Sequence, residues 1–523
     1  MLNKVRTYVW TVRYLKPAQI FRQITKRLGM KCALKGAHPA RKPGHGHAAA
    51  LLPLDYDSVF LNRFSVKELM RDRVSFLYEA EHFSWESCWQ IDGRTPLWNF
   101  NLHYFEFIHP LTMRYLETGD EAFLSKTVQM IRGWIHNNPQ EKSGPGWSAY
   151  TLSLRLTNWM AYLSAVADRL DDPFRAELEE SIYAQYVYLS EHLEKHLLGN
   201  HYFENLKTLV LCALFFDDTR SLPVFLSAFR KECREEILPD GMHFELSPMY
   251  HKIVLEGLIR VTAALREAGQ PDGELEALTK DMLDATYTME HGLNRTPLFN
   301  DSGDNVAKSL DALLAAAKNH LGLIPVNKDA LPAGGYYFFE NGPWKLIVDA
   351  GDAGPDYIPG HSHCDAMSFE LFRNGEPFLV NCGTYAYQCG ERHRFRSTQS
   401  HNTVQAFGVE QSEIWSIFRL ARRSRTRVLE VQETGIRMEM TDYKGNRIRR
   451  ELLLTADALR ITDTAPGLKL QSHLHSISDI EIISSAELSR SEAHYAPEFG
   501  LLQTIHQFTA TGRDTITFTI PLA

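Results

Sequence analysis

The segment SFELFRNGEPFLVNCG, residues 368–383, consists of two short runs of aromatic and branched residues around Asn374-Gly375. Asn-Gly between two such runs is a strong signal for a two-residue β-hairpin. Comparable runs precede it in GGYYFFEN (334–341) and WKLIVDAG (344–351), and alternating runs continue to DTITFTIPL (514–522). We therefore expect residues 331–523 to form an antiparallel β-domain.

Upstream of this region, from about residue 100 to 322, the pattern is helical. In LSLRLTNWMAYLSAVADRL (152–170) apolar residues recur three and four positions apart, as a one-sided helix requires. Ser247 before Pro248 predicts an N-cap followed by the first helical turn. The helices expected from this pattern span 103–117, 121–137, 152–170, 172–195, 200–216, 221–238, 247–269, 273–292 and 309–322. Helices followed by strands indicate two segregated domains, and successive helical hairpins suggest a toroid or a helical array.

The N-terminal part of the chain has an unusual charge. Residues 1–54 contain eleven Lys or Arg and no Asp or Glu, whereas the whole chain carries a formal net charge of -8. We expect a basic N-terminal arm over residues 1–50 and a helical domain over 51–330. The arm is either a solvated lead-in or a basic amphipathic element that contacts an anionic membrane surface or polymer.

Composition excludes several classes of protein. The mild net charge argues against a nucleic-acid binder, and 44% hydrophobic residues are typical of a globular chain. Charged residues interrupt the opening MLNKVRTYVWTVRYLKPAQ, so it does not resemble a signal peptide. Seven cysteines without paired spacing favour a reducing compartment. We expect a protein in the cytoplasm or peripheral to the inner membrane, or a periplasmic one if a leader has been removed.

Four stretches combine titratable residues with turn signals: GNHYFEN (199–205), DGMHFELSPMYH (240–251), GHSHCD (360–365) and NCGTYAYQCGERHRFRSTQSHN (381–402). In the first, Asn200 would cap a helix if its role is structural, but Asn200, His201 and Tyr202 together form a dense cluster of hydrogen-bond donors. In the second, Tyr250 lies near a helix N-terminus, whose dipole can stabilise a phenolate. In the third, His361 and His363 would lie on one face of a strand. Each stretch also has a purely structural interpretation, as a cap, a half-buried tyrosine or a loop.

These residue types favour one kind of chemistry. The stretches contain no clear pair of carboxylates for glycoside hydrolysis and no Gly-x-Ser-x-Gly elbow for a serine nucleophile. Removing a proton next to a uronic carboxylate instead needs donors that neutralise the developing charge, together with an acid and a base. Asn, His and Tyr supply those groups, and Arg binds acidic sugars through paired hydrogen bonds.

Six fragments in fixed order resemble the heparinase II/III proteins and related alginate lyases. They are LWNFNLHYFEFI (97–108), GWSAYTLSLRLTNWM (146–160), GNHYFENLKTLV (199–210), DGMHFELSPMYH (240–251), GHSHCDAMSFELFRNGEPFLVNCGT (360–384) and RSTQSHNTV (396–404). The resemblance implies an incomplete (α/α) toroid followed by a multi-layered antiparallel β-sandwich domain. It also implies a polysaccharide lyase that cleaves an acidic, uronic-acid-containing polysaccharide by β-elimination.

The resemblance assigns roles to individual residues. Asn200 and His361 would neutralise the substrate carboxylate, with His201 beside them. Tyr250 would be the base or acid on the helical side, and Tyr387 its partner on the β-side. We therefore expect the active site between the two domains.

Further residues are expected around this centre. Tyr385 is a nearby rival to Tyr387, and His251, Arg396 and Glu245 are expected to bind substrate. Two other functions remain open on the same residues, a uronyl C5-epimerase and a non-catalytic polysaccharide-binding protein linked to exopolysaccharide synthesis. Neither the polymer nor the oligomeric state is specified by the sequence.

The resemblance also implies a structural Zn²⁺ in the β-domain, held by His, Asp and His. Here His363 and His401 match the two histidines, but Asn381 stands where the aspartate is expected. Because an amide oxygen is a poorer zinc ligand than a carboxylate, the sequence leaves zinc binding open.

Overall fold

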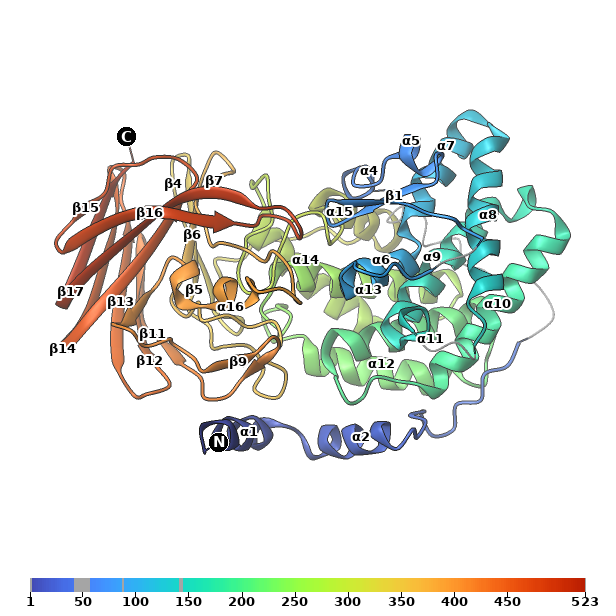
Figure 1. The fold of residues 1–523 in the computed structure, drawn as a ribbon, viewed down its shortest axis with the longest axis horizontal. Helices are drawn as coiled ribbons and strands as arrows, with labels where there is room; N and C mark the ends of the chain where they lie inside the picture. The colour runs from blue at the N-terminus through green and yellow to red at the C-terminus, as the bar shows by residue number, and fades with distance from the viewer. Residues whose placement is uncertain (1, 42–56, 87–88, 141–143, 523) are drawn as a thin grey trace.

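The computed structural model describes residues 2–41, 57–86, 89–140 and 144–522. A helical domain and a β-domain lie side by side along the long axis of the molecule, and two N-terminal helices run along one edge of both (Figure 1). In the described part of the chain, no helix is both long enough and apolar enough to cross a membrane.

The helical domain is the incomplete (α/α) toroid expected from the sequence. Small elements come first: α4 (Ser58–Leu61), α5 (Val66–Leu69), β1 (Arg73–Phe76) and β2 (Glu79–His82). The helices that follow are α6 (Pro96–Tyr104), α7 (His109–Thr118), α8 (Glu121–Asn137), α9 (Ala149–Val166), α10 (Asp172–Glu191), α11 (Gly199–Phe215), α12 (Leu222–Glu236), α13 (Pro248–Glu267), α14 (Gly273–Glu290) and α15 (Leu310–Ala316). Consecutive helices pack as neighbours, α9 on α10, α11 on α12 and α13 on α14, which builds the ring pair by pair.

The helical pattern in the sequence located most of these helices. Ser247 caps α13 as expected, because its hydroxyl accepts a hydrogen bond from the Tyr250 amide. The helix expected over 103–117 is divided instead at Phe105, whose φ of 66° is left-handed and cannot continue a helix. α6 ends there, and a short 3₁₀ turn (Glu106–Ile108) leads into α7.

One antiparallel sheet makes up most of the β-domain. Its main path runs β11 (Arg425–Gln432), β12 (Gly435–Thr441), β13 (Arg447–Leu454), β14 (Ala458–Ser476), β7 (Glu376–Leu379), β6 (Phe369–Arg373), β5 (Trp344–Asp349), β4 (Tyr336–Asn341), β3 (Ala330–Leu331). β8 (Val404–Ala406) and β17 (Gln503–Pro521) pair with β14, and β15 (Ile483–Ser484) and β16 (Glu487–Tyr495) pair with β17. β9 (Ile414–Ser416) and β10 (Arg419–Leu420) form a separate pair.

The Asn374-Gly375 hairpin joins β6 to β7 as the sequence predicted. Both residues have positive φ, 51° and 83°, which is the backbone of a type I′ turn. The sheet folds over, so that β4–β7 and β12–β14 with β17 contribute to one apolar core, giving the layered arrangement expected. Within that core, Arg450 binds Asp463 through two hydrogen bonds of 2.7 and 2.8 Å, with both side chains fully buried.

A second apolar cluster joins the two domains. Met242, Ala285 and Met289 from the helical side pack with Tyr336 and Ile347 of the sheet. Because packed interiors resist deformation, this contact fixes how loops from the two domains face each other.

We expect Arg450→Ala to lower the free energy of unfolding by about 3–5 kcal/mol, because it leaves the Asp463 carboxylate buried without its cation. The matched control is Arg449→Ala. The Arg449 side chain is 65% exposed, so its ion pair with Glu439 contributes about 1 kcal/mol or less. Chemical denaturation of both variants measures the difference. Equal losses would contradict the importance assigned to the buried pair.

Candidate active site

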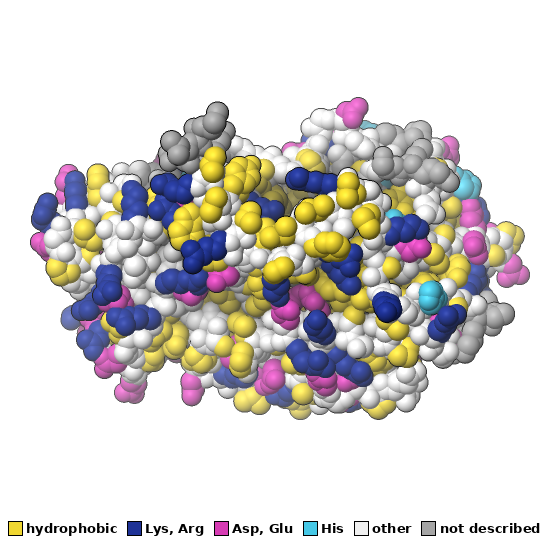
Figure 2. Space-filling view, turned by 90° about the horizontal axis from the view of Figure 1, so that it is seen from below, with side chains coloured by type: hydrophobic (Ala, Val, Ile, Leu, Met, Phe, Trp, Pro, Cys, Tyr) yellow, Lys and Arg dark blue, Asp and Glu magenta, His cyan; other side chains and the backbone are white. Residues whose placement is uncertain are grey.

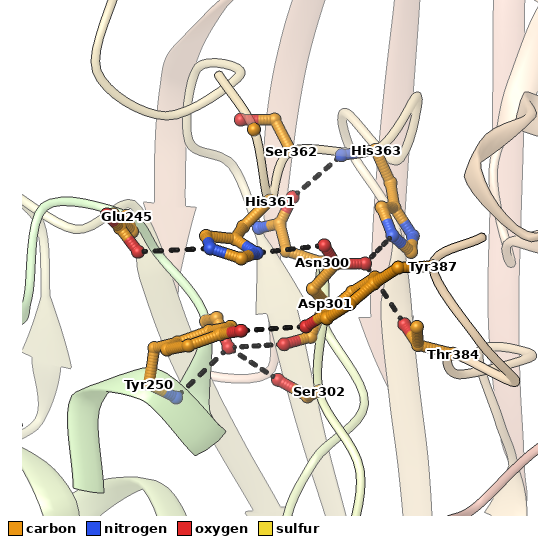
Figure 3. A network of polar contacts seen from close by, with 12 residues as sticks. Glu245, Tyr250, Asn300, Asp301, Ser302, His361, Ser362, His363, Thr384 and Tyr387 are labelled. Carbon is orange, nitrogen blue, oxygen red and sulfur yellow. Dashed lines mark hydrogen bonds and ion pairs between the residues drawn. The ribbon is translucent and has the colours of Figure 1, made fainter. Parts of the chain in front are cut away.

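The buried carboxylate of Asp301 lies at the centre of a polar network that joins the two domains (Figure 3). One oxygen, Oδ2, accepts from His361 Nδ1 at 2.9 Å and from Arg392 Nη2 at 2.7 Å. The other, Oδ1, accepts from His363 Nε2 at 2.8 Å, from the Thr384 hydroxyl at 3.2 Å and from Arg392 Nη1. Asp301 comes from the loop between α14 and α15, whereas its four partners come from the β-domain.

This network fixes the protonation of its members. Burial acts to raise the pKa of Asp301, but the Arg392 guanidinium and the hydrogen bonds from both imidazoles hold that pKa well below its usual value. An ionised carboxylate only accepts hydrogen bonds, so both histidines present N–H groups to it. The second nitrogen of each ring, Nε2 of His361 and Nδ1 of His363, therefore makes no contact with Asp301 and can serve as an acceptor or a metal ligand.

At His361, that second nitrogen meets the start of α11. His361 Nε2 lies 3.3 Å from the amide nitrogen of Asn200, which also donates to Glu245 Oε2 at 3.0 Å. The expected capping role for Asn200 is wrong, because the helix is entered through Leu198 (φ 65°) and Gly199 (φ 57°) and Asn200 already lies inside it. A Cβ on Gly199 would lie 2.3 Å from Glu245 Oε1, so glycine here lets the helix approach that carboxylate.

Two tyrosines complete the centre. The hydroxyls of Tyr250 on α13 and Tyr387 in the β-domain are 2.7 Å apart, and the ring of Tyr250 lies 4.0 Å from that of His361. Burial, and to a smaller extent the neighbouring phenol of Tyr387, raises the pKa of Tyr250 well above its usual value. The helix dipole therefore does not stabilise a resting phenolate, contrary to the expectation from its position. Both groups are neutral phenols at rest.

The structure brings together Asn200, Tyr250, His361 and Tyr387, as the sequence predicted. His201 lies on a neighbouring side of α11, where Nδ1 is 3.2 Å from Glu194 and the ring centre is 4.6 Å from that of Tyr150, with the two rings tilted by 41°. Burial acts to lower the pKa of His201, but Glu194 reverses the effect and raises it.

Two residues expected to bind substrate do not reach this centre. The His251 ring is buried, where Nε2 contacts Thr286 and Nδ1 accepts the His243 amide. The Arg396 guanidinium is buried and donates to main-chain carbonyls, including that of Ser362 at 2.8 Å. The polar atoms of both side chains are hydrogen-bonded to other protein groups. The expectation that His251 and Arg396 bind substrate is therefore wrong, and both residues have a structural role.

The remaining expected residues are placed as follows. Glu245 reaches the centre, but as a buried acceptor for Asn200. Tyr385 stacks on Phe395 with ring centres 6.5 Å apart, so Tyr387 is the tyrosine that pairs with Tyr250. Asp301 was not predicted from the sequence, although NDSGD (300–304) is a polar turn similar to the four stretches that were singled out.

A candidate metal site lies behind His363. The expectation that His361 and His363 open a strand is wrong, because they lie in the loop between β5 and β6. The ligand atoms of His363, Asp365 and His401 nevertheless lie within 4.8 Å of one another, and all three residues are buried. Nδ1 of His363 and Nε2 of His401 are buried without hydrogen-bond partners, as expected of nitrogens that hold a metal ion.

These three side chains fit zinc, and the third of them is Asp365 in place of the expected Asn381. Asn381 Oδ1 lies 3.2 Å from His401 Nδ1, on the side of the ring away from the unpartnered Nε2. Asn381 therefore orients the imidazole, and the carboxylate that completes the set belongs to Asp365. Two imidazoles and a carboxylate are ordinary zinc ligands.

Comparisons with known proteins agree with this two-domain fold. A family model described as heparinase II/III N-terminus matches residues 57–330, and one described as heparinase II/III-like, C-terminal, matches residues 324–517. Heparin-sulfate lyases from Pedobacter heparinus and Bacteroides thetaiotaomicron are 25% and 23% identical, over 62% and 58% of this chain and 54% and 51% of their own. The chain thus spans about half the length of these curated relatives. A crystal structure of heparinase III superposes with a TM-score of 0.67 at 16% identity, over 95% of this chain and 88% of the other.

The structural assignment of His251 predicts a pH effect. Burial, with His243 nearby, lowers the pKa of His251 to about 3, against about 6.5 in an unfolded chain. As the pH falls from about 6.5 towards 4, the unfolded state gains a proton here that the folded state does not, so stability falls by about 1.4 kcal/mol per pH unit. Other buried histidines, such as His243 and His473, add to the total slope, so His251→Gln should reduce it by about this amount in denaturation curves recorded across the range. An unchanged slope would contradict the assignment.

Proposed function

The chain belongs to the heparinase II/III family, and from that premise we propose that it cleaves a uronic-acid-containing polysaccharide by β-elimination. The observation that carries the proposal is the hydroxyl pair of Tyr250 and Tyr387 beside Asn200 and His361, with each domain contributing one tyrosine and one donor. This arrangement places charge-neutralising groups and proton-transfer groups around one point.

The first requirement is to neutralise the uronate carboxylate. Asn200 Nδ2 and His361 Nε2 are adjacent and present their polar atoms to the same space. Because Asp301 accepts the Nδ1–H of His361, a protonated ring keeps a buried counter-ion while Nε2–H donates to the substrate. Neutralising the carboxylate stabilises the negative charge that spreads onto it when C5 loses its proton.

The second requirement is to move two protons. The C5–H bond breaks and its electrons form the C4=C5 double bond, while the C4–O4 bond breaks and O4 receives a proton. We assign the base to Tyr387, which must lose its own proton before it can accept the C5 proton. Burial and Asp301 raise the pKa of Tyr387, whereas the hydrogen bond from Tyr250 and the Arg392 guanidinium, 5.0 Å from the ring centre, act to lower it and so favour the phenolate at this member of the pair. Tyr250 then protonates O4, and the 2.7 Å hydroxyl contact lets the pair return the proton between them after turnover.

We also propose that His363, Asp365 and His401 hold a structural Zn²⁺ that ties the loop carrying His361 to the loop before β8. The two unpartnered imidazole nitrogens support this proposal. When bound, the ion supplies a fixed cross-link between loops. The proton transfers are carried out by the tyrosines.

The experiment that tests the function is a screen of uronic-acid polysaccharides for the ultraviolet absorbance of an unsaturated uronate. On the polymer that reacts, Tyr250→Phe should lower the rate at least about a hundredfold, since general acid–base groups commonly contribute 10²–10⁴. The control is Tyr336→Phe, whose buried hydroxyl donates to the Leu246 carbonyl at 2.6 Å. It should lose about 1 kcal/mol of stability and keep its activity. Wild-type turnover in Tyr250→Phe would contradict the assignment.

The zinc proposal predicts stoichiometric zinc in protein purified without chelator. His401→Ala should lose it, because a ligand nitrogen is removed, and should unfold at a lower temperature. His494→Ala, at a 40% exposed β-domain histidine, is the control that should keep the metal. Elemental analysis measures the zinc content of the three proteins, and thermal melts measure their stability. Equal zinc content in wild type and His401→Ala would contradict the proposed zinc site.

A further inference from the structure

The N-terminal helix α1 (Leu2–Tyr14) presents its apolar stripe to solvent. Val5, Val9 and Val12 follow the four- and three-residue spacing of one helix face and are 57%, 62% and 50% exposed. In a helix that packs on a globular core, such a stripe faces the protein. Here it faces outward.

The second helix, α2 (Pro17–Arg27), repeats the arrangement. Phe21, Ile24 and Leu28, the residue just after the helix, are 57%, 54% and 71% exposed. The residues that the two helices bury against the protein are polar, namely Thr11, Gln19 and Thr25. Both helices are thus amphipathic with their usual orientation reversed.

Specific polar contacts hold the helices in this orientation. On the β-domain side, Trp415 Nε1 donates to the Thr11 hydroxyl at 3.0 Å. The side-chain amide of Gln19 donates to the carbonyls of Leu197 and Tyr357, both at 3.4 Å. The arm is therefore attached to both domains, and its apolar stripe stays uncovered.

The charge of this face is positive. Residues 2–28 contain seven Lys or Arg and no Asp or Glu, and two of these cations, Arg6 and Lys16, pair with Glu413 and Glu235 of the two domains. Arg13 and Arg27 are exposed beside the apolar stripe. Figure 2, which views the molecule from this side, shows hydrophobic and basic side chains together along the arm.

We propose that the outer face of α1 and α2 docks onto the surface of an anionic lipid bilayer. Exposed apolar side chains flanked by Lys and Arg suit the interface, where the apolar groups enter the acyl boundary and the cations meet lipid phosphates. A second copy of this chain fits less well, because two such faces would bring like charges together. A soluble anionic polymer would use the cations and leave the apolar stripe uncovered.

This docking goes beyond the proposed lyase activity and has a consequence for it. Leu197 and Tyr357, which bind Gln19, lie three and four residues before Asn200 and His361. The arm therefore braces the two segments that lead into the candidate active site. Docking holds that site close to the bilayer, where a membrane-associated polysaccharide would be presented.

The test is flotation of the full chain with vesicles of phosphatidylcholine alone or mixed with phosphatidylglycerol. We expect binding to the mixed vesicles that weakens as salt rises, and little binding to the neutral ones. Val9→Asp/Ile24→Asp should lower the partition coefficient at least about tenfold, since carboxylates replace two apolar side chains that would enter the bilayer. Both positions are exposed, so thermal melts should be unchanged.

The matched control is Ile324→Asp/Val326→Asp, at apolar residues of similar exposure, 67% and 59%, outside the arm. It should bind vesicles like the wild type. Equal binding to both vesicle types, or equal binding by the two double variants, would overturn the proposal. Sedimentation that shows a dimer abolished only by the arm variant would also overturn it, in favour of self-association. None of these readouts depends on lyase activity.

Discussion

The ion pair between Asp301 and Arg392 is the interaction on which the rest of the site depends. Removing both charges from water is costly, and only bidentate contact with further hydrogen bonds offsets that cost. Here His361, His363 and Thr384 supply those bonds. One carboxylate from the helical domain therefore fixes two connections of the β-domain, β5–β6 and β7–β8, and with them the orientation of the His361 imidazole.

Both domains contribute side chains to the candidate active site. α11 and α13 provide Asn200 and Tyr250, and the β-domain provides His361 and Tyr387. Apolar packing around Met242 and Tyr336 sets the distance between the domains. Further contact comes from the arm, which is bound to Trp415 on one side and to Leu197 on the other. A movement between the domains would thus separate the hydroxyl pair and make room for a sugar chain.

Local features of the sequence predicted much of this. The Asn374-Gly375 turn and the helical periodicity are encoded in neighbouring residues, so hairpin and helices could be located. Asp301 was missed because its partners lie 60 or more residues away, and spacing along the chain does not reveal such pairs. His251 follows Tyr250 directly, but one helical step turns it into the interior. The periodicity of the N-terminal helices likewise does not reveal that their apolar face points to solvent. That orientation depends on polar contacts with distant residues, such as the one between Thr11 and Trp415.

The measurement that tests the central claim most directly is the mass of the products formed in water enriched in heavy oxygen. Elimination adds no water, so the account predicts shortened chains in which the new non-reducing end is one water lighter than the corresponding hydrolysis product and cleavage introduces no heavy oxygen. Products that incorporate a heavy oxygen at the cleaved bond would show hydrolysis. Epimerised chains of unchanged length would show that the C5 proton is removed without cleavage. Either result would contradict the account.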